Sequence, residues 1–210
     1  MMKGTFITFA AVVGFLLASP VFGAVKPVHH EIELNGIRHI DISHSVGNIH
    51  IVPATDSNTA QLEATIKGCS KGWFRGIKDV TDTDFVISKR GDTLYIKFDQ
   101  DNTEATFTLT IPMIEQLSIH LGVGNVSGAL YIAKTDINIG VGNADLTAPL
   151  ATTGYITMNT ALGHTHVKGT QQQNTTRAVV TSSVKARGEG GYPLDVNVGV
   201  GNSSLNLTVE

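Results

Sequence analysis

Basic charge, cysteine and aromatic side chains are all scarce in this sequence, and each shortage excludes a class of protein. With 15 Lys and Arg against 18 Asp and Glu, the net charge of -3 leaves no cationic excess for binding a nucleic-acid backbone. The single cysteine, Cys69, excludes an intrachain disulfide and a Cys-x-x-Cys zinc pattern. Aromatic residues make up only 6% of the 210 residues, so a core must be built from Val, Ile, Leu and Ala.

Residues 1–24 have the layout of a secretory signal peptide. A lysine precedes an apolar run from Phe6 to Ala18, and small residues follow it. The run is shorter than the roughly 20 residues that a membrane-spanning helix needs. We therefore predict that this segment directs export to the periplasm or the cell surface, and that residues 25–210 form a single domain.

Short glycine motifs recur along the rest of the chain. Gly-Val-Gly-Asn and its variants Ser-Val-Gly-Asn and Ala-Leu-Gly-His occur at residues 45–48, 122–125, 140–143, 161–164 and 199–202. With a degenerate copy ending at Ser183, the later copies recur about every 19 residues. This period is too short for a helical-hairpin repeat and is typical of one coil of a β-solenoid.

The apolar residues change phase at these motifs. Alternate residues from Leu117 to Val123 are apolar, and after Gly124-Asn125 the apolar set is shifted by one position to Val126. A corner at Gly-Asn would keep the apolar side chains inside, because both residues tolerate positive φ. A hairpin turn at Gly-Asn is the alternative. We favour the corner, since stacked coils would align a polar ladder of Asn48, Asn125, Asn143, His164, Ser183 and Asn202.

The part before these coils, residues 25–116, is less regular. Alternating apolar residues predict strands at 60–67, 84–88, 93–98 and 104–111, with a glycine-rich loop at 68–78. The predicted fold class is therefore all-β: a β-solenoid of stacked coils of about 19 residues over residues 117–210, preceded by a more irregular β part.

The loop at 68–78 contains the candidate interaction residues. Two aromatic side chains lie between cations in the run Lys71, Trp73, Phe74 and Arg75. Trp and Arg are favoured at protein interfaces and at lipid headgroups, so the loop is a candidate contact site. The other interpretation is that these residues cap an open end of the stack.

Catalytic and metal-binding patterns are weak. A zinc or copper site needs three or four converging ligands, and His120, His164 and His166 are the best candidates among the 8 histidines. Asp136, Asp145 and Asp195 lie on different coils with no repeated pairing of the kind that glycoside hydrolysis uses. We predict no enzymatic activity, no cofactor and no metal site.

Several structural motifs carry a family resemblance. They are Ile49-His50-Ile51, the turn and strand at 91–96, the strand ending in Leu109-Thr110-Ile111-Pro112, and the tandem Gly-Asn coils. In this order they resemble the bacterial envelope proteins called putative adhesins, whose toastrack-like domains consist of β-solenoid repeats. The resemblance covers roughly residues 30–210 and implies a surface or envelope role without implying any site residue.

We expect a non-enzymatic, exported envelope protein that acts as an adhesion, scaffold or interaction module. The alternative is a carbohydrate-binding or weakly carbohydrate-active β-helix protein. The expected partner is an envelope protein or a glycan, not a nucleic acid. Terminal strands of a stack expose free edges, so we also expect self-association through these edges.

Overall fold

The computed structural model describes residues 25–54, 58–70, 76–131 and 134–209. The strands within them are β1 (Val25–Glu33), β2 (His39–Val46), β3 (Ile49–Pro53), β4 (Thr59–Gly68), β5 (Val86–Arg90), β6 (Thr93–Phe98), β7 (Thr103–Ile111), β8 (Gln116–Ala129), β9 (Lys134–Pro149), β10 (Thr153–Lys168), β11 (Gln173–Arg177), β12 (Ser182–Arg187) and β13 (Tyr192–Thr208). The described residues include no helix. The all-β prediction is confirmed, and each of the four strands expected before residue 116 overlaps an observed strand.

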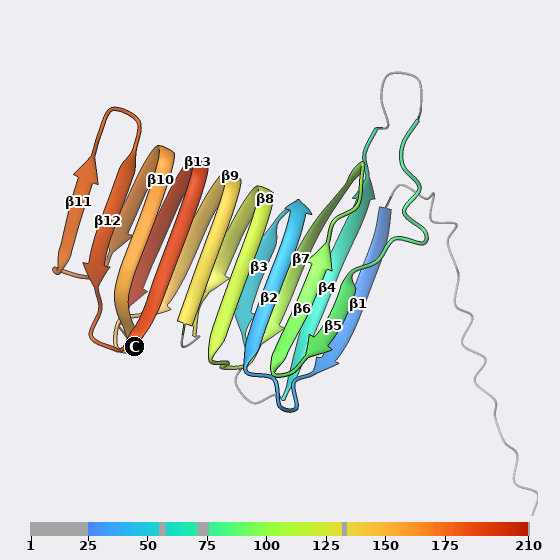
Figure 1. The fold of residues 1–210 in the computed structure, drawn as a ribbon, viewed down its shortest axis with the longest axis horizontal. Helices are drawn as coiled ribbons and strands as arrows, with labels where there is room; N and C mark the ends of the chain where they lie inside the picture. Colours follow the sequence, from blue (N-terminus) through green and yellow to red (C-terminus); the bar gives the residue numbers. More distant parts are fainter. Residues whose placement is uncertain (1–24, 55–57, 71–75, 132–133, 210) are drawn as a thin grey trace, which may run out of the picture.

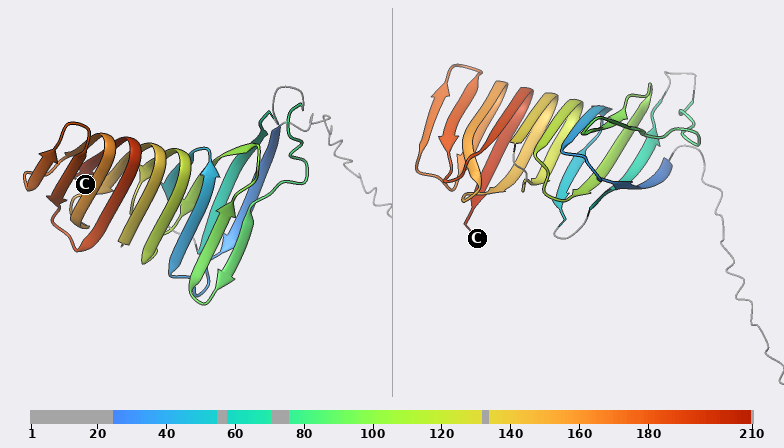
Figure 2. Two further views of the ribbon diagram at one scale, coloured as in Figure 1. Left: turned by 45° about the horizontal axis from the view of Figure 1, so that its top comes forward. Right: turned by 60° about the horizontal axis from the view of Figure 1, so that its bottom comes forward.

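These 13 strands form one sheet that is folded into two layers (Figures 1 and 2). The first layer has the order β5-β6-β2-β8-β9-β13-β10-β12-β11, and the second has the order β1-β4-β7-β3-β8-β9-β13-β10. The strands β8, β9, β13 and β10 belong to both layers because each is 14 to 17 residues long and bends near its middle. The first half of each strand lies in the first layer and the second half in the second layer.

The bends occur at the glycine in the third position of each motif. Gly124 has a φ of 142° and Gly142 a φ of 148°, values that side chains disfavour. A Cβ atom on Gly142 would lie 1.6 Å from the carbonyl oxygen of Gly124. The pairing of β8 with β9 stays parallel through the bend, with Asn125 beside Asn143. The hairpin alternative is therefore wrong, and the chain turns a corner at Gly-Asn.

The order of the strands differs from the order of the motifs in the sequence. The strand β13 lies between β9 and β10 and pairs in parallel with both (Figure 1). The segment around Ser183 is not an equivalent bent strand, because β12 runs antiparallel to β10 and places Ser183 beside Asn159. Two antiparallel strands, β12 and β11, thus replace the coil that the sequence spacing predicted.

The core lies between the two layers and is largely aliphatic. Ile119, Ile137, Val196 and Met158 are fully buried side chains from successive bent strands. Nearer the N-terminal strands, Phe85, Phe98 and Phe107 pack together with ring centroids about 5 Å apart. Four of the eight phenylalanines lie in residues 1–24. The buried phenylalanines are concentrated at one end of the core, and the bent strands pack mainly through Val, Ile and Leu.

Candidate functional site

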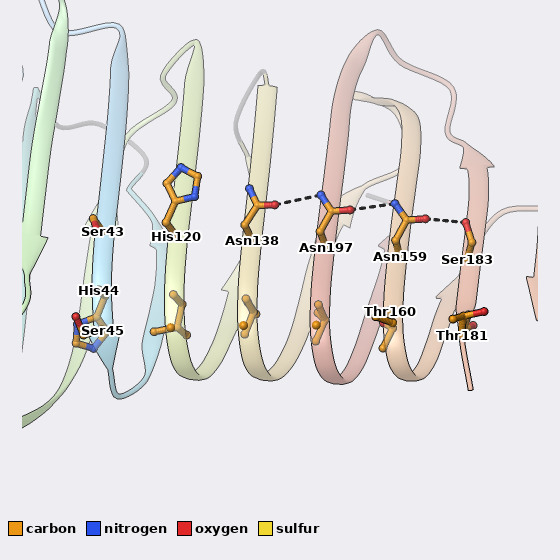
Figure 3. Close-up of a pocket in the computed structure, with 18 of the residues that line it drawn as sticks. Ser43, His44, Ser45, His120, Asn138, Asn159, Thr160, Thr181, Ser183 and Asn197 are labelled. Atoms are coloured by element: carbon orange, nitrogen blue, oxygen red, sulfur yellow. Dashed lines mark hydrogen bonds between the residues drawn. The ribbon is translucent and has the colours of Figure 1, made fainter. Parts of the chain in front are cut away.

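A groove lies on the outer face of the first layer. It has a volume of about 950 Å³ and crosses β2, β8, β9, β13, β10 and β12 at right angles, ending at Thr176 in β11. Figure 3 shows its lining as rows of equivalent side chains from neighbouring strands. The groove is therefore elongated, and one repeat of the stack contributes each segment of it.

One wall of the groove is a row of polar side chains connected by hydrogen bonds (Figure 3). Asn197 Nδ2 donates to Asn138 Oδ1 at 3.2 Å, and Asn159 Nδ2 donates to Asn197 Oδ1 at 3.0 Å. The hydroxyl of Ser183 donates to Asn159 Oδ1 at 2.7 Å, and His120 extends the row in β8. Asn197 and Asn159 each use one N–H and one oxygen lone pair within the row, and Asn138 accepts within the row while its Nδ2 donates to Asp136 Oδ1, which leaves further donors and acceptors for a ligand.

The floor of the groove consists of small residues for a packing reason. Gly122, Gly140 and Gly199 occupy equivalent positions, two residues after the members of the polar row. A Cβ atom on each would lie 2.5 or 2.6 Å from a carbonyl oxygen of the neighbouring strand. Close stacking near the bend requires these glycines, and their missing side chains leave the trough open.

An apolar row lies immediately beyond this floor. Val123, Val141, Val200 and Leu162 are paired in register, and each side chain is 43 to 48% exposed. Val46 continues the row in β2. The groove thus has a hydrogen-bonding row on one side and a solvent-exposed aliphatic row at its other margin.

The residues that line the groove include no Asp, Glu, Lys or Arg. Their only ionisable side chains are His44 and His120. His44 is 3% exposed, and its Nε2 donates to the carbonyl oxygen of Ala105 at 2.8 Å. Burial lowers the pKa of His44, and the hydrogen bonds with the backbone of Ala105 and Phe98 oppose this shift only in part. No carboxylate and no Lys or Arg side chain therefore contributes a charge to the lining of the groove.

The lowered pKa of His44 predicts a loss of stability on mild acidification. Above the ordinary pKa of 6.5, the imidazole is neutral in the folded and unfolded chains alike. Below this pH the unfolded chain binds a proton that the folded chain does not, so the free energy of unfolding falls until the folded pKa is passed. We expect urea midpoints to fall from about pH 7 to pH 5, and to fall less in His44→Leu. If the urea midpoints of the two proteins fell by the same amount between pH 7 and pH 5, this role of His44 would be contradicted.

The structure brings together five of the six predicted ladder residues on the outside of the bend. Asn143 donates through its backbone N and its Nδ2 to Asn125 Oδ1, both at 3.0 Å. The same paired contacts join Asn125 to Asn48 and Asn202 to Asn143, and the backbone N of His164 donates to Asn202. Ser183 does not belong to this ladder, because it lies in the polar row of the groove.

The other predicted site residues are not gathered into a site. The candidate interaction loop of Lys71, Trp73, Phe74 and Arg75 lies outside the described residues. Within the described part of the chain, no three His, Cys, Asp or Glu side chains are grouped so that they could hold a metal ion. Nor does that part contain a helix with the length and hydropathy needed to cross a membrane.

The sequence contains a signal for the polar row, although the glycine motifs alone do not include it. Asn138, Asn159 and Asn197 each stand two residues before the first position of a glycine motif. His120 and Ser43 occupy the same relative position in their own motifs. A repeat motif extended by two residues toward the N-terminus includes the residues that form this wall of the groove.

Comparisons with known proteins give a likeness of fold. No protein-family model matches the sequence, and no curated protein matches it. One similar solved structure is that of a putative cell adhesion protein from Clostridium sporogenes, with a TM-score of 0.53 and 11% identity over 88% of this chain and 100% of the other. A putative adhesin from Bacteroides fragilis aligns over 87% of this chain and 97% of its own, with a TM-score of 0.27 and 10% identity. The chain therefore shares its all-β fold with the first of these proteins.

Proposed function

We propose that this protein is a non-enzymatic adhesion module of the cell envelope, exported by residues 1–24 to the periplasm or the cell surface. The fold likeness to a solved structure described as a putative cell adhesion protein supports this proposal. So does the architecture, which we interpret as a short β-solenoid: bent strands repeat in register and present equivalent side chains in straight rows. Such rows are suited to binding extended, repetitive partners.

The ligand proposed for the groove is a neutral glycan chain, which gives the carbohydrate-binding alternative a specific place. The observation that carries it is the uncharged groove with its wall of carboxamides, Asn138, Asn197 and Asn159. Carboxamides can donate to and accept from sugar hydroxyls at once. They recur at the strand spacing of about 4.8 Å, which is close to the length of one hexose in an extended chain, whereas a peptide repeats at about 3.3 Å per residue.

The same lining supports the proposal that the groove binds a glycan without cleaving it. Glycoside hydrolysis uses a pair of carboxyl groups on either side of the bond that breaks. The groove-lining residues supply carboxamides, hydroxyls and imidazoles and no carboxyl group. Asp136 and Asp195, which are paired in register two residues before Asn138 and Asn197, lie beside the lining, and Asp136 accepts a hydrogen bond from Asn138 Nδ2. The proposed role is therefore retention of a glycan and not its hydrolysis.

Filling the groove tests this function. Ala161 is an exposed residue of the floor, so we expect Ala161→Trp to occupy the trough without disturbing the core. The measurement is calorimetric titration with neutral oligosaccharides selected on a glycan array, and the expected Kd rises about tenfold or more.

The matched control is His166→Trp, which adds the same side chain at an exposed position of β10 in the second layer. We expect this variant to bind like the unchanged protein. Equal binding by all three proteins would place the glycan site elsewhere, and no binding of neutral glycans by the unchanged protein would rule out the proposed ligand class.

A further inference from the structure

The two ends of the folded sheet differ in how well their edges are covered. At the end formed by β1 and β5, the segment 79–85 packs against the layers with Val80 and Phe85 buried. Lys26 Nζ in β1 donates to the carbonyl oxygen of Thr83 at 2.8 Å. The strand β1 also contains Pro27, and β5 ends in Lys89-Arg90, so both strands have features that discourage edge pairing.

The opposite end finishes in β11, which has no such protection. All five residues of β11 are exposed, its sequence is Gln-Asn-Thr-Thr-Arg, and its single charge is Arg177. The second layer stops at β10, two strands short of β11 (Figure 1). Among the described strands, only β12 pairs with β11.

The hydrogen bonds of the hairpin show which backbone groups of β11 are free. The backbone N of Ala178 donates to Thr181 O at 3.1 Å, and the backbone N of Arg187 donates to Gln172 O at 2.9 Å. In an antiparallel pair, hydrogen-bonded residues alternate along the strand. Between these two points, Asn174 and Thr176 are therefore the residues whose backbone N–H and C=O groups point toward β12. The N–H and C=O groups of Gln173, Thr175 and Arg177 point away from the sheet, toward the open edge.

We propose that β11 is a self-association edge, which pairs antiparallel with β11 of a second copy around a two-fold axis at Thr175. In this register the outward groups of Thr175 meet those of Thr175 in the second copy, and Gln173 meets Arg177. Three outward residues on each chain then exchange about six backbone hydrogen bonds. The pairing extends the first layer of one copy into that of the other.

Charge favours a second copy of this chain as the partner. The two-fold register places the only charged side chain, Arg177, opposite the neutral amide of Gln173 and never opposite its own copy. Thr faces Thr and Asn174 faces Thr176, which are pairs that hydrogen-bond across strands. The strand is thus complementary to itself. This inference does not depend on the glycan groove and can fail without affecting the proposed function.

A proline at Thr175 tests the inference directly. Its backbone N–H faces away from β12, so Thr175→Pro removes an intermolecular donor and leaves the β11–β12 hydrogen bonds in place. Thr175→Val is the matched control, because it keeps the N–H. Sedimentation velocity over a concentration series, with reductant present because Cys69 is an exposed free thiol, should show dimers of the unchanged protein and the valine variant. The dimer Kd of the proline variant should be at least about tenfold higher.

A charge exchange tests the register separately. Gln173→Arg brings a second cation opposite Arg177 of the other copy, and we expect weaker dimers that recover at high salt. The double variant Gln173→Arg, Arg177→Gln restores one charge per pair and should restore dimerisation. A protein that stays monomeric at all concentrations, or a Thr175→Pro variant that dimerises like the unchanged protein, would overturn the inference. Failure of the double variant to recover would overturn the register.

Discussion

Gly142→Ala is expected to abolish the native fold. The Cβ atom that alanine adds would lie 1.6 Å from the carbonyl oxygen of Gly124, and the φ of 148° is itself unfavourable for any side chain. The obstacle is backbone, because the three nearest heavy atoms all belong to the main chain of Gly124 in the neighbouring strand. No rotamer change relieves it. We expect the free energy of unfolding to fall by more than about 4 kcal/mol, measured by urea or thermal unfolding followed by circular dichroism.

The matched control is Gly91→Ala, at another glycine with positive φ. Gly91 has a φ of 61°, and a Cβ atom there meets no atom within 4 Å. We expect a cost of only about 1 kcal/mol, from the backbone conformation alone. If the Gly142 variant melted within a few degrees of the Gly91 variant, the close stacking of the bends would be wrong.

Phe107→Ala should have the second largest effect. Phe107 is 1% exposed in β7, and its ring makes edge contacts with His44 at 5.4 Å and Phe85 at 5.3 Å between centroids. Truncation leaves a cavity between the two layers, beside the few aromatic side chains of the core. The expected loss is about 3–5 kcal/mol of unfolding free energy. Met113→Ala is the control, because Met113 is 61% exposed and its truncation should cost less than about 0.5 kcal/mol.

The position of the bends was predictable from the sequence because a bend has a local cause. A strand buries every second residue, so the change from buried Leu121 to buried Val126, five positions later, requires a break in the alternation between them. The expectation that Val123 also lies inside is wrong, because its side chain is exposed at the bend. Glycine is required there by positive φ and by the close approach of the next strand. Both constraints act on a few residues, so the glycine and the change in apolar alternation mark the bend in the sequence.

The spatial order of the strands was not predictable from the motifs, because the motifs are nearly identical. Any copy of Gly-Val-Gly-Asn can pair in register with any other. The distinguishing feature is a set of buried hydroxyl groups: Thr160, Thr165 and Ser203 hydrogen-bond to one another at 2.9 to 3.2 Å. Ser203 occupies the inward position that is Val126 in β8 and Ala144 in β9. A polar group there favours a place beside β10, where partners exist.

The assignment of Ser183 to the corner ladder failed for a related reason. The equal spacing of the motifs predicted a coil of the usual length at Ser183. The chain instead reverses in a tight hairpin at Ala178–Thr181, and β11 and β12 pair antiparallel. Ser183 still meets an asparagine, Asn159, in the groove. The groove itself depends on this reversal, because β12 and β11 form its end.

The position of β13 has a consequence for how the chain acquires its structure. β9 and β10 follow each other along the chain, yet a strand that begins only at Tyr192 separates them. Until β13 forms, β9 and β10 expose unpaired edges that can pair with each other through their nearly identical glycine motifs. Pairing of β9 with β10 before β13 forms would be a kinetic trap, because the two strands would have to separate again before β13 could insert. We therefore expect refolding to be limited by this late insertion.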